Sequence, residues 1–116
     1  MSIQRLKTND RMSQAVIHGD TVYLAGQVAQ TARGESVRAQ TIAILAQIDA
    51  LLAEAGTDKT KALSATIWLA NMEDFAEMNA VWDEWSKGGN APCRACVESR
   101  LASPDFTVEI GLIAAR

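Results

Sequence analysis

Residues 90–116, NAPCRACVESRLASPDFTVEIGLIAAR, contain two β-strand patterns joined by a polar loop. The second pattern alternates strictly: one face carries Phe106, Val108, Ile110 and Leu112, and the other carries Thr107, Glu109, Gly111 and Ile113. A period of two is typical of a strand that buries one face in a core. The first pattern, residues 94–98, follows a Gly-Gly loop and Pro92. The segment therefore predicts two consecutive strands of a sheet.

Earlier segments predict the remaining strands. Two short apolar runs, residues 15–18 and 21–25, flank the turn His18-Gly19-Asp20-Thr21 and indicate a β-hairpin. Residues 2–8, SIQRLKT, favour a further strand before this hairpin. Residues 61–70, KALSATIWLA, also have strand character, because β-branched and aromatic side chains occupy their centre.

Between these strands the apolar period changes to that of a helix. In residues 36–55 apolar side chains recur at steps of three and four, and Gly56 stands where a helix usually ends. The recurring positions are Thr41, Ile44, Leu45, Ile48, Leu51, Leu52 and Ala55. A second helix is predicted between Asn71, a favoured N-cap residue type, and Gly88-Gly89. Its apolar stripe consists of Phe75, Met78, Val81, Trp82 and Trp85.

This order of elements predicts one α+β domain over residues 1–116, with two helices packed on one face of a single sheet. Two helices cover only one side of such a sheet. The strands containing TVYLA (residues 21–25) and TIWLA (residues 66–70) nevertheless look apolar on both faces. An uncovered apolar face of this kind is typical of a surface that binds a partner subunit, so we expect an oligomer.

Composition and charge argue against nucleic acid, a membrane span and secretion. The net charge is −3 and the basic residues are scattered, which disfavours nucleic acid, because phosphate binding needs a clustered basic surface. No apolar stretch approaches the ~20 residues of a membrane span. The N-terminal residues MSIQRLKTND have no apolar core typical of a secretory signal. We therefore expect a soluble cytoplasmic protein with reduced cysteines.

The C-x-x-C motif at Cys93 and Cys96 suggests either a redox dithiol or half of a zinc site. In a strand, however, side chains three residues apart point to opposite faces. A zinc site would need further ligands, and the chain has one histidine, His18, which lies in the predicted hairpin turn. We therefore expect neither a dithiol site nor a metal site here.

Arg94 and Glu109 are the charged residues that attract attention in these strands. A partly buried guanidinium cannot lose its charge, so Arg94 needs an acidic neighbour or an anionic ligand. One interpretation is a structural ion pair between Arg94 and Glu109. The other is functional: Arg94 binds a substrate carboxylate with two parallel hydrogen bonds, and Glu109 holds a water or accepts a proton. The pattern alone leaves both open.

Four segments in order along the chain resemble the Rid family, also called the YjgF family. Residues 90–116 resemble its C-terminal signature, and LAGQVA resembles the S-G-Q segment that follows the first hairpin. LAQIDALLAEAG resembles the first helix, and ATIWLANMEDFAEMNAVWDEW resembles the following strand and second helix. The resemblance covers residues 3–116, and we identify a divergent RidA-like subgroup.

The resemblance implies a chorismate-mutase-like fold of the Bacillus type, with one mixed β-sheet, assembled as a homotrimer. The sheets of the three subunits would line a central barrel, the helices would face outward, and the sites would lie in clefts between neighbouring subunits. The implied activity is hydrolysis of reactive 2-imino acids (enamine/imine intermediates) to 2-oxo acids and ammonia. No metal or organic cofactor is implied.

Site residues carry over position by position. The resemblance implies that Arg94 binds the substrate carboxylate and that Glu109 orients the attacking water. Asn79 matches an asparagine of the site region, and Cys96 matches a cysteine that lines the pocket. These four residues are the first part of the expected site.

Three further positions of the expected substrate site depart from the family pattern. Met12 stands where a tyrosine is expected, Ala25 replaces the serine of S-G-Q, and Ala95 replaces the Ser/Thr after the arginine. Loss of three hydroxyls supports an alternative function, a non-catalytic trimer that binds small carboxylates for regulation. Ribonuclease activity, attributed to some relatives, is disfavoured by the acidic charge balance.

Overall fold

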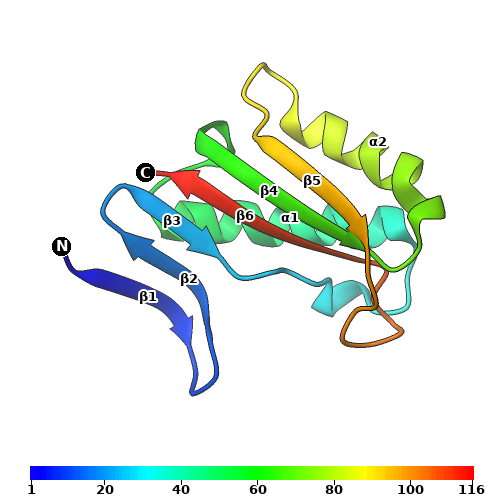
Figure 1. The fold of residues 1–116 in the computed structure, drawn as a ribbon, viewed down its shortest axis with the longest axis horizontal. Coiled ribbons are helices and arrows are strands. Elements are labelled where there is room, and N and C mark those ends of the chain that lie inside the picture. Colours follow the sequence, from blue (N-terminus) through cyan, green and yellow to red (C-terminus); the bar gives the residue numbers. More distant parts are fainter.

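A six-stranded sheet with two helices on one face forms the domain, and the computed structural model describes all residues, 1–116 (Figure 1). The strands are β1 (Ile3–Thr8), β2 (Ser13–His18), β3 (Thr21–Leu24), β4 (Ala62–Leu69), β5 (Cys93–Glu98) and β6 (Val108–Ala115). The helices are α1 (Val37–Glu54) and α2 (Phe75–Ser86). Short 3₁₀ turns occupy Gln30–Ala32, Lys59–Lys61 and Met72–Asp74. The predicted α+β class and the order of elements are confirmed.

The strand order in space is β1-β2-β3-β6-β4-β5. β4 and β5 are parallel, because α2 connects them as a crossover, and every other pair is antiparallel. The sheet is therefore mixed, as the resemblance implies. β6 lies between β3 and β4, so the strand nearest the C-terminus joins the N-terminal hairpin to the rest of the sheet (Figure 1).

Helix α1 forms as the sequence pattern predicts. The Ser36 hydroxyl accepts the backbone N–H of Ala39 at 3.1 Å and caps the helix N-terminus. The helix ends before Gly56, whose φ of +84° is the left-handed conformation that glycine adopts readily. All the predicted stripe positions are buried against the sheet or α2: Thr41, Ile44, Leu45, Ile48, Leu51, Leu52 and Ala55.

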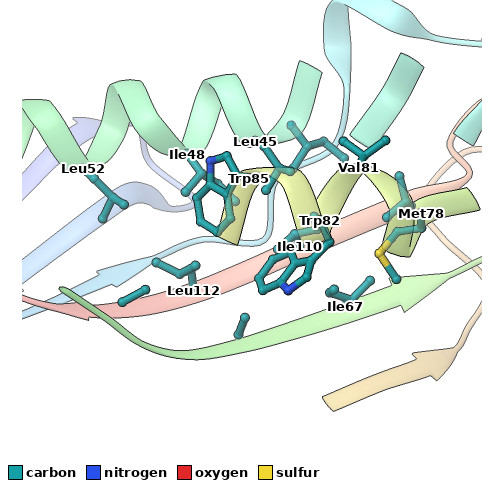
Figure 2. Close-up of a cluster of buried hydrophobic side chains, with 14 of the residues drawn as sticks. Leu45, Ile48, Leu52, Ile67, Met78, Val81, Trp82, Trp85, Ile110 and Leu112 are labelled. Carbon is teal, nitrogen blue, oxygen red and sulfur yellow. The ribbon is translucent and has the colours of Figure 1, made fainter. Parts of the chain in front are cut away.

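Helix α2 begins later than the sequence pattern predicts. Asn71 is a cap, but its side chain accepts the N–H of Glu73 and starts a 3₁₀ turn; the α-helix proper begins at Phe75. Four of the five stripe residues are buried, and Figure 2 shows Trp82 and Trp85 packed between α1 and the sheet residues Ile67 and Ile110. The fifth residue, Phe75, is 38% exposed, because the helix starts at the edge of the core.

The two faces of the sheet differ in what covers them. Buried side chains of β6 point toward the helices: Val108, Ile110, Leu112 and Ala114. The other side, here called the open face, has no helix over it. Tyr23, Leu63 and Val97 remain 45–50% exposed there. Neither α1 nor α2 combines the length and the apolar composition of a membrane-spanning helix.

Two isoleucines of α1 provide a matched test of this packing. Ile48 is fully buried, whereas Ile42 is 50% exposed on the same helix. We expect Ile48→Ala to lower the free energy of unfolding by about 3 kcal/mol, because it leaves a cavity in the core, and Ile42→Ala to change it by about 0.5 kcal/mol or less. Urea unfolding at one protein concentration measures both. Equal losses for the two variants would contradict the assigned helix faces.

Candidate functional site

Arg94 projects from β5 toward helix α2. Its parallel neighbour on β4 is Ala65, a buried residue, so the Arg94 side chain starts on the helix-covered face of the sheet. Arg94 Nη1 donates a hydrogen bond to Asn79 Oδ1 at 2.7 Å. The guanidinium carbon lies 5.4 Å from the ring centre of Trp82 and 5.8 Å from that of Phe75. One amide and two aromatic rings therefore hold the guanidinium in place.

These three contacts come from one face of α2. Phe75, Asn79 and Trp82 are four and three residues apart, which is the spacing of neighbours on a helix surface. Since β4, α2 and β5 form a crossover unit, this face of the helix lies over the start of β5. The helical spacing of Phe75, Asn79 and Trp82 therefore brings all three side chains into contact with the Arg94 guanidinium.

No carboxylate of the chain neutralises Arg94. The two ion pairs of the structure are Arg33–Asp105 and Glu84–Lys87. The hydrogen bond to Asn79 uses Nη1 only, so the Nε and Nη2 donors of the guanidinium have no partner within the chain. A partly buried cation with free donors is suited to a carboxylate or another planar anion.

Cys96 lies two residues along β5 on the same face as Arg94 and packs against the hydrophobic core. Burial raises the pKa of the Cys96 thiol, and the nearby Arg94 charge only partly opposes this. Cys93 is exposed on the other face, where its Sγ lies 3.2 Å from the carbonyl oxygen of Leu63. The prediction that the two sulfurs point to opposite faces is confirmed, so one chain cannot use them as a dithiol.

Glu109 occupies the open face of the sheet. Its partner on β4 is Trp68, and its carboxyl lies against the backbone of Gly26 in the connection that follows β3. The side chain has no hydrogen bond or ion pair within the chain. Burial raises the pKa of Glu109, with no charged neighbour as a cause. The group is therefore held partly out of water without a fixed partner.

Arg94 and Glu109 are not brought together within one chain. The interpretation as an internal ion pair is wrong, because the two side chains start on opposite faces and β4 lies between their strands. Alternation predicts each strand's own two faces, but only the register between strands decides which faces coincide. Here Arg94 aligns with the buried Ala65, whereas Glu109 aligns with Trp68 on the open face.

The remaining predicted residues divide between the two regions. Asn79 and Cys96 accompany Arg94, whereas Ala25 precedes Gly26 and so lies beside Glu109. The N–H of Ala25 donates to the carbonyl of Gln14, which places the β1–β2 turn with Met12 at this same end of the sheet. Met12 is 41% exposed. Ala95 is exposed on β5, on the face opposite to Arg94.

Three neighbours of these groups are not indicated as site residues by the sequence pattern. The pattern places Phe75 and Trp82 only in the core stripe, although their spacing from Asn79 puts all three on one helix face. The contact between Gly26 and Glu109 joins positions far apart in the chain, and no local pattern indicates it.

Replacing Glu109 by glutamine tests the burial of its carboxyl. A carboxyl whose pKa is raised by folding contributes stability below its unfolded-state pKa of ~4.3, and this is lost as the pH rises through the folded-state pKa. The ionised group therefore opposes folding at neutral pH. We expect Glu109→Gln to be more stable than the parent in urea unfolding at pH 7, and this gain to disappear toward pH 4.

The control for this comparison is Glu77→Gln. Glu77 is an exposed residue in the first turn of α2, where the helix dipole favours a carboxylate, so this change should give no gain at pH 7. A gain for Glu109→Gln that is the same at both pH values would contradict the assignment to carboxyl burial.

Comparison with known proteins covers the whole chain. The family described as Endoribonuclease L-PSP matches residues 2–116. A RutC family protein from Haemophilus ducreyi is 45% identical over 97% of this chain and 96% of its own. The RutC family protein YoaB from Escherichia coli (strain K12) is 43% identical over 99% of both chains.

A solved structure also resembles this chain over its whole length. The crystal structure of a member of the YjgF protein family from Neisseria meningitidis superposes with a TM-score of 0.96 at 46% identity. The match covers 100% of this chain and 96% of the other. Sequence and fold therefore lead to the same group of proteins.

Proposed function

Since the chain belongs to the endoribonuclease L-PSP family, which is the Rid or YjgF family, we propose that it hydrolyses reactive 2-imino acids to 2-oxo acids and ammonia. The observation that carries this proposal is the half-buried Arg94 guanidinium, which has free donors and no carboxylate partner in its own chain. A 2-imino acid supplies the missing carboxylate and presents a C=N carbon next to it.

Arg94 acts by positioning the substrate. The hydrogen bond to Asn79 and the rings of Trp82 and Phe75 hold the guanidinium plane, so its free Nε and Nη2 edge can form two parallel hydrogen bonds to the carboxylate. A fixed carboxylate limits the rotation of the adjoining C=N group and selects the face that water attacks. Orientation of this kind contributes to the rate because it removes most unproductive encounters.

Glu109 acts as the proton carrier. In the protonated imine, water oxygen adds to the C=N carbon while Glu109 accepts one water proton, and the C=N electron pair moves to nitrogen, which gives a neutral carbinolamine. Glu109 then returns this proton to the amine nitrogen. As the C–N bond breaks and ammonia leaves, the C=O bond forms and the carbinolamine hydroxyl gives its proton to Glu109, which releases it to solvent. The raised pKa of Glu109 supports this role, because a more basic carboxylate takes a proton from water more readily.

The site needs two subunits. Arg94 and Glu109 start on opposite faces of one sheet, so a small substrate that contacts both must bind Arg94 of one copy and Glu109 of a neighbouring copy. A closed ring in which each subunit contacts the next through two different surfaces would form such sites at every interface. We propose the homotrimer as this ring, with the exposed open-face residues Tyr23, Leu63 and Val97 covered in the assembly.

The alternative is a trimer that binds small carboxylates without converting them. The absence of hydroxyls at Met12, Ala25 and Ala95 favours this function, because fewer groups remain to orient water. The name endoribonuclease describes the family, and the net charge of −3 gives no support to RNA as a substrate here.

A coupled assay tests the proposed reaction. An amino-acid oxidase or threonine dehydratase generates imino acids, and semicarbazide traps whatever imine escapes hydrolysis. We expect the parent protein to suppress the semicarbazone signal. Arg94→Ala should lower kcat/KM about 100-fold or more, and Glu109→Gln should lower kcat about 100-fold or more, because the first loses orientation and the second the proton carrier.

The matched control is Arg38→Ala, which removes an exposed arginine from α1 and should leave the activity unchanged. If the parent protein leaves the semicarbazone signal untouched for every imino acid but still binds 2-oxo acids through Arg94, the binding trimer replaces the enzyme as the assigned function.

Mixed trimers test the two-subunit site. We expect Arg94→Ala and Glu109→Ala homotrimers to be inactive. Coexpression with two different affinity tags and purification through both yields trimers that contain both variants. Each such trimer retains one intact interface, so we expect roughly a third of the parent activity. Sites contained within single chains would give no recovery at all, and that result would exclude the shared site.

A further inference from the structure

Gly26 lies directly beneath the carboxyl group of Glu109. A Cβ atom at position 26 would lie 3.0 Å from Cδ and 3.3 Å from Cγ of Glu109, and it would overlap Oε2. Gly26 does not have the left-handed backbone conformation for which glycine is usually required. The absence of a side chain at this position is therefore explained by the space that the Glu109 carboxyl occupies.

The residue after Gly26 anchors this segment to β6. Gln27 exchanges two backbone hydrogen bonds with Ile110, the strand neighbour of Glu109, at 2.8 and 3.1 Å. Its side chain is also fixed: Nε2 donates to Gln14 Oε1 at 2.9 Å and to the carbonyl of Ala25 at 3.1 Å. Gln47 Nε2 on α1 donates to Gln27 Oε1 at 3.2 Å. Gln27 is only 6% exposed, so these bonds form out of solvent.

From these contacts we infer that Gly26 and Gln27 form a backbone cradle that positions the Glu109 carboxyl on the open face of the sheet. Gly26 provides the space, and Gln27 holds Gly26 at a constant distance from β6. The carboxyl has no hydrogen-bond partner of its own within the chain, so contact with this backbone is what limits its position. Gly26 and Gln27 are thus positioning residues that act through Glu109.

The electrostatic surroundings agree with this role. Within one chain, the Glu109 carboxyl is surrounded by the segment from Ala25 to Val28, by β4 and by β6 itself, and none of them carries another charged side chain on the open face. In the proposed homotrimer the nearest charge would be Arg94 of a neighbouring copy, which acts against the effect of burial on the pKa. Burial alone raises the pKa of Glu109. The cradle therefore reduces the hydration of the carboxyl without adding a charge. The consequence for catalysis rests on the proposed function, but the cradle itself does not.

A double-mutant cycle in stability tests the cradle without any activity assay. We expect Gly26→Ala to lower the thermal midpoint by roughly 4 °C in the parent, because the new methyl group displaces the carboxyl. In the Glu109→Ala background the same change should cause little or no loss, because the overlapping group is gone. Equal losses in both backgrounds would overturn the inference. If the Gly26→Ala single variant does not fold but the Gly26→Ala/Glu109→Ala double variant does, the inference stands. If both variants fail to fold, the inference is wrong.

Gly111→Ala is the matched control for this cycle. Gly111 lies on the same face, and a Cβ there would lie 3.4 Å from the Trp68 ring and 4.0 Å from the Gly26 Cα, which are ordinary contact distances, without touching Glu109. Its effect on the midpoint should be the same whether position 109 is Glu or Ala. If the effect of Gly111→Ala on the midpoint also depended on residue 109, any methyl group added on this face would produce the coupling, and the inference would fail.

A second measurement follows the carboxyl itself. In protein with ¹³C-labelled glutamate, the Glu109 carboxyl signal reports its titration. We expect Gln27→Met, which fills similar space without the amide hydrogen bonds, to move the pKa of Glu109 downward toward that of a solvated glutamate. An unchanged titration would show that Gln27 serves stability only and does not position the carboxyl.

The kinetic consequence separates the cradle from the proposed reaction. If the parent hydrolyses imines, Gly26→Ala should lower kcat about tenfold with little change in KM, because Arg94 still binds the carboxylate. If the parent does not hydrolyse imines, the proposed function fails, while the cycle and the titration still decide whether the cradle exists.

Discussion

The pairing of β6 with β4 is the constraint on which the rest of the structure depends. Its register places Ile110 opposite Ile67 on the helix-covered face and Glu109 opposite Trp68 on the open face, so the buried side chains of the two strands lie on the same side of the sheet. A shift by one residue would turn the apolar set of β6 to the open face and Glu109 into the core. Helix packing and the positions of the charged groups both follow from this register.

The sequence predicts the elements well because their causes are local. The stripe of α1, its Ser36 cap and Gly56 are all contained within one segment, and the alternation of β6 needs no partner to be recognised. The start of α2 was displaced because Asn71 suits a 3₁₀ turn as well as an α-helix. Asn71 could cap either a 3₁₀ turn or the first turn of an α-helix, and the sequence alone does not favour one of them.

The candidate site was harder to predict because its causes are not local. The sequence pattern assigns Arg94 and Glu109 each to one face of its own strand, but whether these faces coincide depends on the register of two separate strand pairs. The contacts of Arg94 with α2 and the contact between Gly26 and Glu109 likewise join segments that are distant in the sequence. The resemblance to a family indicates Arg94 and Glu109 as site residues, whereas only the structure shows that they lie on opposite faces of the sheet.

The central position of β6 also has a kinetic consequence. Before β6 docks, the sheet exists only as two separate parts, the β1–β2–β3 hairpin region and the parallel β4–β5 unit, and each has an unpaired edge. Joining them requires contacts such as that between Tyr23 and Ile113, which are distant in sequence, so loop-closure entropy opposes the step until late in folding. The free edges of β3 and β4 are then the surfaces through which incompletely folded chains would aggregate. The strand that holds Glu109 thus also covers these two edges, and only β1 and β5 remain as edge strands of the finished sheet.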